Sequence, residues 1–384
     1  MLTRRKVLSG VSGAAVLMAS QPAWSVVNPP PNIVVIIADD LPMTAYVNPE
    51  DGNFTGFSTF LRKHVSGEGA PQDFTDYRSF YAKPECDPAR ASLFSGQEIY
   101  HHGVLDNTED DVWDDTHTFF HALSLLMDGG NNKIYPAAGW FGKVLANYQG
   151  LNKPLIQPEG ITDFYGFVGL AKYWGYYLNQ PDPNNVGGRL KVYHPQSAGD
   201  DQYETDFLTA RARDFITANA SSPFTMCLAF HNPHEPAVAA PRDTSKLNNY
   251  KSGGSATQLP IPRAPDFDVI PTGLQTGHWL NSLPPINQTG EDNTLKSIAK
   301  AAFAVDTAVQ SIYDTLNSLG ILDNTILIVT SDQGFHIGEK RWTVKRTAYQ
   351  PTVHCPLAIR WPSSYGVPTG EAKESQATDF TTKK

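Results

Sequence analysis

The sequence contains few cysteines. Cys86, Cys227 and Cys355 are the three thiols in 384 residues. So small and odd a number excludes a disulfide-stapled scaffold and leaves at least one thiol free. A bond between Cys227 and Cys355 stays open at this point, because only the distance between their backbones could decide it.

Excess positive charge and long apolar runs are also missing. The formal net charge is −9, and an acidic chain argues against nucleic acid or an anionic membrane surface as a partner. After residue 25 no apolar stretch reaches the ~20 residues of a transmembrane helix, so we expect no stable membrane insertion. The content of 40% hydrophobic and 18% charged residues is ordinary for a globular protein.

The first 25 residues have the features of a targeting segment. Basic residues at 4–6 precede an apolar stretch at 11–19, and Ala23-Trp24-Ser25 is a small-residue cleavage site. The pair Arg4-Arg5 favours the twin-arginine route of bacterial export, although two arginines can pair by chance in a general secretory signal. We therefore expect export to the periplasm or the exterior, with residues 26–384 as the mature catalytic domain.

Strands and helices are expected to alternate along this domain. Continuous apolar runs at 32–38, 224–230 and 325–330 are typical of strands buried on both faces, and amphipathic patterns at 205–218 and 294–319 predict helices. This order predicts an α/β fold with a mostly parallel central sheet. Residues 149–200 and 237–290 lack periodicity and are expected to be long loop excursions, which often shape substrate pockets.

Polar residues directly follow three of the expected strands. They are Asp39 and Asp40 after the first, His234 after the second, and Asp332 and Gln333 after the third. Because the carboxyl ends of parallel strands meet at one edge of a sheet, these side chains should lie together. The oxygen donors, with no soft partner, favour a hard cation and Ca²⁺ more than Zn²⁺. The Asp pair alone could also be turn chemistry.

Cys86 precedes a proline that can open a helix, with Arg90 one turn further on. A side chain at a helix start faces free N–H groups and the positive end of the helix dipole, a position that suits an anion or a nucleophile attacking one. Cys86 is therefore a candidate catalytic group, although a loop cysteine before an ordinary helix fits the same pattern. Lys143, near the end of an apolar stretch, must reach water or meet an anion, and Lys345 follows the third polar cluster.

These motifs together resemble the type I sulfatases of the alkaline phosphatase superfamily. The resemblance runs from about residue 31 to the C-terminus and rests on IVVIIADD, CDPARASLFSG, PHEP, and DQG with its downstream lysine. The strings NPHEPAVAAPR, GFHIGEKRW and GKVLANY are most similar to the N-acetylglucosamine-6-sulfatase, endosulfatase and arylsulfatase branch. The resemblance implies an alkaline-phosphatase-like α/β/α sandwich and hydrolysis of sulfate monoesters on a sulfated carbohydrate or an aryl sulfate.

The resemblance also implies cofactors and residue roles. Cys86 would be converted to formylglycine by a dedicated maturation machinery, and the hydrated aldehyde would be the nucleophile. One Ca²⁺ would be held by residue 86 with Asp39, Asp40, Asp332 and Gln333. Arg90 would support the aldehyde hydrate, while Lys143, His234 and Lys345 would bind sulfate and assist the leaving oxygen. A phosphonate monoester or phosphodiester hydrolase, or a non-catalytic binder of sulfated glycans, are the alternatives.

The sequence departs from the family pattern at two places. Leu145 and Ala146 occupy the positions where relatives carry the histidine or asparagine that helps sulfate leave, so His102 and Asn147 are the remaining candidates for that base. The family also carries a smaller C-terminal subdomain. Since this sequence stops at Lys384, we expect that subdomain to be missing or truncated.

Overall fold

The computed structural model describes residues 30–43, 59–67, 70–77, 82–108, 112–146, 148–152, 154–255, 259–362 and 365. The predicted signal peptide at 1–25, Asn147 and the predicted C-terminal truncation all lie outside these residues. None of the described helices combines the length and the apolar character that a bilayer span requires.

A nine-stranded sheet forms the centre of the molecule, in the order β2-β11-β10-β1-β7-β3-β4-β5-β6. The five central strands from β10 to β4 run parallel, and antiparallel strands extend the sheet at both edges. Their bounds are β1 Asn32–Ala38, β2 Phe74–Asp76, β3 Ala137–Gly142, β4 Asp163–Val168, β5 Tyr176–Pro181, β6 Arg189–His194, β7 Phe224–Ala229, β10 Thr325–Ser331 and β11 Leu357–Arg360. The parallel prediction is therefore confirmed for the centre of the sheet.

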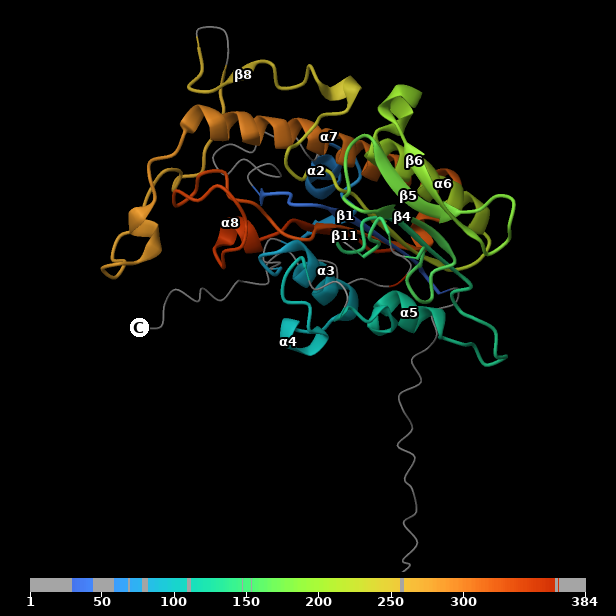
Figure 1. The fold of residues 1–384 in the computed structure, drawn as a ribbon. Coiled ribbons are helices and arrows are strands. Elements are labelled where there is room, and N and C mark those ends of the chain that lie inside the picture. The colour runs from blue at the N-terminus through green and yellow to red at the C-terminus, as the bar shows by residue number, and fades with distance from the viewer. Residues whose placement is uncertain are drawn as a thin grey trace, which may run out of the picture.

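Helices cover both faces of the sheet, as Figure 1 shows. On one face lie α2 (Thr59–Ser66), α6 (Glu204–Asn219) and α7 (Gln288–Ser318). On the other lie α3 (Cys86–Ser95), α4 (Ile99–His102) and α5 (Phe119–Ser124). The predicted α/β/α sandwich is confirmed.

Strand β1 supplies both layers of the core, because successive side chains of a strand point to opposite faces. Val34 and Ile36 pack in the cluster under α6 and α7, whereas Val35 and Ile37 pack with Phe94 of α3 in the cluster on the other side. All four β1 side chains are buried, which explains the continuous apolar run.

The prediction of a long loop at 149–200 is wrong. This region contains β4, β5 and β6, which pair antiparallel with one another and extend the sheet. Each of these strands mixes buried with partly or fully exposed residues, as in Tyr176–Pro181, which fits an edge of the sheet rather than its centre.

The second predicted excursion, 237–290, is mostly irregular. It contains only short elements among the described residues: η5 (Pro241–Asp243), β8 (Tyr250–Lys251), β9 (Leu259–Pro260) and η6 (Trp279–Ser282). The remaining short elements are η2 (Asp115–His117), η3 (Gln196–Ala198), η4 (Asp200–Gln202), η7 (Leu322–Asn324) and α8 (Gln350–Val353).

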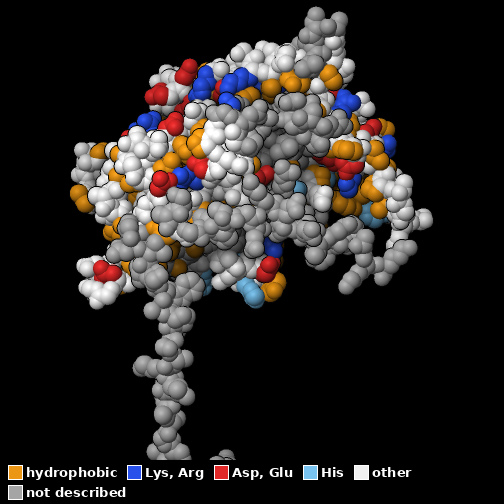
Figure 2. Space-filling view, turned by 180° about the vertical axis from the view of Figure 1, so that it is seen from behind, with side chains coloured by type: hydrophobic (Ala, Val, Ile, Leu, Met, Phe, Trp, Pro, Cys, Tyr) orange, Lys and Arg blue, Asp and Glu red, His pale blue; other side chains and the backbone are white. Residues whose placement is uncertain are grey.

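All three cysteines are buried and free, so the bond that the sequence left open between Cys227 and Cys355 is not formed. On the face drawn in Figure 2, acidic and basic side chains are interspersed among apolar ones.

Candidate active site

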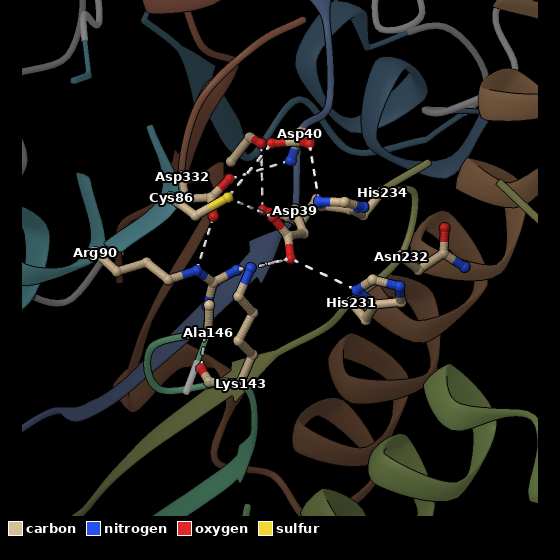
Figure 3. A network of polar contacts seen from close by, with 12 residues as sticks. Asp39, Asp40, Cys86, Arg90, Lys143, Ala146, His231, Asn232, His234 and Asp332 are labelled. Atoms are coloured by element: carbon tan, nitrogen blue, oxygen red, sulfur yellow. Dashed lines mark hydrogen bonds and ion pairs between the residues drawn. The ribbon is translucent and has the colours of Figure 1, made fainter. Parts of the chain in front are cut away.

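The carboxyl ends of the parallel strands bring the predicted site residues together, as expected. Figure 3 shows side chains from the end of β1, the start of α3 and the segments after β3, β7 and β10 converging on one point. The cluster contains Asp39, Asp40, Cys86, Arg90, Lys143, His234, Asp332, Gln333 and Lys345.

Cys86 is the first residue of α3 and is only 1% exposed. Gln333 Nε2 and Lys345 Nζ lie 3.0 Å and 2.9 Å from its Sγ. Burial and the neighbouring carboxylates raise the pKa of the Cys86 thiol, although Lys143 opposes this. The thiol is therefore held in its neutral form, in which cysteine is a weak nucleophile.

Asp39 and Asp40 place two carboxylates beside Cys86. Their Oδ1 atoms lie 3.6 Å and 3.8 Å from Sγ. Asp40 adopts φ 61°, a left-handed conformation that is uncommon for a residue with a side chain and that occurs at functional sites. Its backbone N–H donates to Asp332 Oδ1 at 3.1 Å, which ties the end of β1 to the end of β10.

Three buried or half-buried cations face these carboxylates. Arg90 Nε donates to Asp332 Oδ2 at 2.7 Å, and Lys143 Nζ donates to Asp39 Oδ2 at 2.5 Å. Lys345 Nζ donates to Asp40 Oδ2 at 2.7 Å. Each carboxylate thus has its own cationic partner, which a buried charge requires.

This pairing sets the protonation of the carboxylates. Burial would raise the pKa of Asp39, but Lys143 and Arg90 hold it well below its ordinary value. For Asp332, burial and the repulsion of Asp39 prevail and raise the pKa to about 7. Another positive charge in the cluster would favour the ionised form of both side chains.

The residues fit a hard divalent cation. Ligand atoms of Asp39, Asp40, Cys86 and His234 lie within 4.8 Å of one another. Gln333 Oε1 is buried and has no hydrogen-bond partner among the described residues, as expected of an amide oxygen that serves as a metal ligand. Carboxylate and amide oxygens are the ligands that Ca²⁺ and Mg²⁺ prefer.

Gly142 positions Lys143 at the end of β3. The glycine has φ +111°, and an added Cβ would lie 1.9 Å from the carbonyl oxygen of Ala229 on β7. The neighbouring strands can therefore approach closely, and Lys143 N–H donates to the same carbonyl at 2.8 Å. A side chain at position 142 would push Lys143 away from Asp39.

The structure adds His231 to the residues predicted from the sequence. Its ring stacks on His234 with centroids 4.9 Å apart, and its Nδ1 lies 3.8 Å from Asp39 Oδ2. Burial, only partly opposed by Asp39, lowers the pKa of His231 to about 4, so the imidazole is neutral. The PHEP motif drew attention to His234 alone, but His231 lies three residues earlier in the same strand-end segment.

Of the two candidates for the base that helps sulfate leave, His102 and Asn147, the structure describes only His102. His102 accepts a hydrogen bond from Val104 N–H through Nδ1, and its Nε2 lies 3.0 Å from Ser92 Oγ. These contacts hold His102, the last residue of α4, against Ser92 on α3. Leu145 is buried in the apolar core.

A cavity of about 630 Å³ opens onto the cluster. Four lining residues belong to the cluster around Cys86, and we call their part of the cavity its inner end: Cys86, Lys143, His231 and His234. We call the remaining lining residues the outer wall: Asn107, Ala146, Leu170, Ala171, Lys172, Tyr173, Trp174, Glu235, Pro236 and Val238. The cavity therefore gives the cluster access to a ligand larger than a free inorganic anion.

Glu204, at the start of α6, supports the segment that carries the two histidines. Its Oε1 accepts hydrogen bonds from Asn232 N–H and Thr205 Oγ1, both at 3.0 Å, whereas Oε2 is buried and has no partner in the described part of the chain. Complete burial raises the pKa of Glu204 from 4.5 to about 8. The side chain is therefore protonated in the folded protein at neutral pH.

We expect Glu204→Gln to stabilise the protein at alkaline pH. A carboxyl whose pKa is raised by folding favours the folded state at low pH, and this contribution is lost as pH rises from about 4.5 to about 8. Urea unfolding should show the variant gaining about 3 kcal/mol over the wild type between pH 5 and pH 8. Glu159→Gln, at an exposed carboxylate, is the matched control. Parallel stability curves for Glu204→Gln and the wild type would contradict the buried neutral carboxyl.

Comparison with known proteins adds independent information. The sulfatase family model matches residues 31–382. The extracellular sulfatase SULF-1 homolog of Drosophila melanogaster is 26% identical over 343 residues, which cover 86% of this chain and 27% of the relative. The N-acetylglucosamine-6-sulfatase of Capra hircus is 26% identical over 356 residues, which cover 86% of this chain and 56% of the relative. The chain thus spans about half or less of the length of these relatives.

Solved structures show the same fold. A protein in complex with its substrate D-glucosamine-2-N,6-O-disulfate matches with a TM-score of 0.58 and 19% identity, covering 87% of this chain and 72% of that one. The phosphonate monoester hydrolase of Silicibacter pomeroyi matches with a TM-score of 0.56 and 21% identity, covering 86% and 68%. At these identities the likeness concerns the architecture alone.

Proposed function

The chain belongs to the sulfatase family, and on that premise we propose that it hydrolyses sulfate monoesters of a sulfated carbohydrate or an aryl alcohol. The observation that carries the proposal is the position of Cys86. Its side chain lies at a helix start, among three carboxylates and three cations, at the inner end of a cavity. Such a position suits a nucleophile that attacks an anionic ester.

The nucleophile is proposed to be formylglycine, made from Cys86 by a maturation enzyme. When present, formylglycine supplies a hydrated aldehyde, whose hydroxyl groups replace the neutral thiol. A divalent cation, proposed to be Ca²⁺, supplies Lewis-acid polarisation when it is bound. The residues proposed to hold it are Asp39, Asp40, Asp332 and Gln333, together with residue 86.

The chain's own cations are proposed to bind the sulfate group. Lys345 Nζ lies 2.9 Å from the Cys86 Sγ and 3.3 Å from His234 Nε2, so both groups can reach an oxygen attached near residue 86. Lys143 Nζ approaches the same point from β3 and lines the cavity. These donors would neutralise the charge that develops on the sulfate and on the leaving oxygen. Arg90, fully buried between Asp332 and Asp39, is proposed to fix the positions of these carboxylates.

Export is part of the proposal. The expected signal peptide at 1–25 and the extracellular relatives both favour it, and the twin-arginine route fits the paired arginines. N-terminal sequencing of the protein recovered from outside the cytoplasm would identify the cleavage site.

The proposed activity is tested with three chromogenic esters. The protein, co-produced with a formylglycine-generating enzyme, is expected to hydrolyse 4-nitrophenyl sulfate faster than a phosphonate monoester or a phosphodiester of the same phenol. Protein produced without that enzyme is the control and should be inactive, because its residue 86 stays a neutral thiol.

Two results would overturn the proposal. Faster turnover of the phosphonate or the phosphodiester would assign the chain to the activity of its structural neighbour from Silicibacter pomeroyi. Binding of sulfated glycans without turnover of any ester, by protein shown to carry formylglycine, would make it a non-catalytic binder.

A further inference from the structure

We propose that Lys172 recognises a second anionic group on the substrate, so that the preferred substrate is a sulfated sugar that also carries another sulfate or a carboxylate. This inference rests on the proposed function and specifies its substrate. It concerns the outer wall of the cavity, whereas the chemistry takes place at the inner end.

One loop forms much of this wall. Residues 169–175 connect the antiparallel strands β4 and β5, and five consecutive members, 170–174, line the cavity that contains Cys86. A hairpin loop at the mouth of a cavity contacts the part of the substrate that differs between related ligands. This loop is therefore the segment best placed to select the alcohol.

Tyr173 anchors the loop to the site. Its hydroxyl donates to the His234 carbonyl oxygen at 2.6 Å, and its own carbonyl accepts from Glu204 N–H at 3.1 Å. Its ring lies 5.1 Å from that of His231. Trp174 packs edge-on against Tyr203 with centroids 5.3 Å apart. The backbone that presents Lys172 is thus held in place before a ligand arrives, which lowers the entropy cost of binding.

Lys172 differs from the two lysines beside Cys86, of which only Lys143 lines the cavity. Lys143 is buried and donates to Asp39, and Lys345 donates to Asp40, so the charges of both are already compensated. Lys172 is exposed, and within the described part of the chain no hydrogen bond or ion pair engages its ammonium group. An uncompensated ammonium at the mouth of a cavity attracts an anion and can donate charge-assisted hydrogen bonds to it.

The rest of the wall indicates where that anion lies and what carries it. Glu235 also lines the cavity, and its carboxylate would repel a second anion, whereas the ammonium group of Lys172 would attract one. Leu170, which is 68% exposed, and Trp174 and Pro236 offer an apolar surface. Such a surface suits the flat face of a ring, and a sugar ring can carry one sulfate toward Cys86 and a second anion toward Lys172.

The test compares Lys172→Met with the wild type on substrates that differ in their second anion. The probes are 4-nitrophenyl sulfate, D-glucosamine-2-N,6-O-disulfate, and a sulfated disaccharide that contains a uronic acid. We expect kcat/KM to fall about tenfold for a probe with the second anion, since a hydrogen bond to a charged group is lost. For 4-nitrophenyl sulfate the change should be less than about twofold, as for a screened surface charge. A loss confined to the disulfate or to the uronate identifies the anion.

Lys133→Met, at an exposed lysine outside the cavity, is the matched control and should leave all three values unchanged. An equal fall for all three probes, or no fall for any, would overturn the role of Lys172. Binding of the disulfate to Cys86→Ala protein, measured by calorimetry with and without Lys172→Met, gives a readout that needs no turnover. Unchanged affinity there also overturns the inference, whereas weakened affinity in a protein that hydrolyses no sulfate ester would overturn only the proposed function.

Discussion

Replacing Cys86 with alanine is expected to lower the rate of sulfate release by at least about 10⁴-fold, the order of loss seen when an enzyme loses its nucleophile. The fold should survive, because Gln333 and Lys345 keep their contacts with Asp40 when Sγ is removed. The measurement is sulfate release by the purified variant, together with its thermal unfolding.

Cys227→Ala is the matched control for this variant. Cys227 is also a fully buried thiol, but it lies within β7 in the apolar core and does not line the cavity. Its replacement should cost about 1 kcal/mol of stability and leave turnover near the wild-type value. Retained activity in Cys86→Ala would refute the nucleophile, and an unmodified cysteine at position 86 in active protein would refute formylglycine.

Removing divalent cations is expected to have the second largest effect, a fall in kcat/KM of at least about 100-fold, because Lewis-acid stabilisation of developing charge contributes several kcal/mol. Dialysis against a chelator should produce the loss, and Ca²⁺ should restore activity more fully than Zn²⁺ because the ligands are oxygens. A cation that binds only the folded protein also stabilises the fold. The gain is about 2.7 kcal/mol when the free cation concentration is 100 times the dissociation constant. The melting temperature should therefore rise with Ca²⁺ in parallel with activity.

The stability readout separates a structural ion from an incidental one. Asp40→Asn removes a proposed ligand and should abolish the Ca²⁺-dependent rise in melting temperature, whereas Asp201→Asn, at an exposed carboxylate on η4, should preserve it. If neither activity nor melting temperature responds to the chelator or to added Ca²⁺, the proposed cation site is wrong.

The centre of the fold and the positions of the polar clusters could be predicted because one rule governs both. Strands buried on two faces leave continuous apolar runs, and the residues after them, such as Asp39 and Asp332, must lie along one edge of the sheet. Lys345 belongs to no strand, so the strand rule does not place it. Only the resemblance to the family predicts that it lies near Cys86.

The edge strands, and the burial of single polar residues by tertiary contacts, could not be predicted from the sequence. The strands β4–β6 mix buried with partly exposed residues and contain several tyrosines and charged side chains, so neither a continuous apolar run nor a clean alternation marks them. From the sequence alone, Glu204 is an ordinary acidic residue in the first turn of a helix, where a charged carboxylate is favourable. Its raised pKa arises from complete burial beside Asn232, a contact 28 residues away in sequence. His231 likewise became a member of the site only through its contacts with Asp39 and Tyr173.

The antiparallel strands β4 and β5 carry a consequence for how such a protein can diversify. Cys86 and the side chains around it come from α3 and from segments that follow the parallel strands. Residues 170–174, which also line the cavity, belong instead to the hairpin loop between β4 and β5. Mutations at Leu170 and Lys172 can therefore change which alcohol is accepted without disturbing the charge pairs that Asp39, Asp40 and Asp332 require. Tyr173 must be kept, because its hydroxyl donates to the His234 carbonyl. Selectivity and reactivity are thus largely separable in this architecture, and variation of the hairpin around a retained tyrosine is a direct route to new specificities.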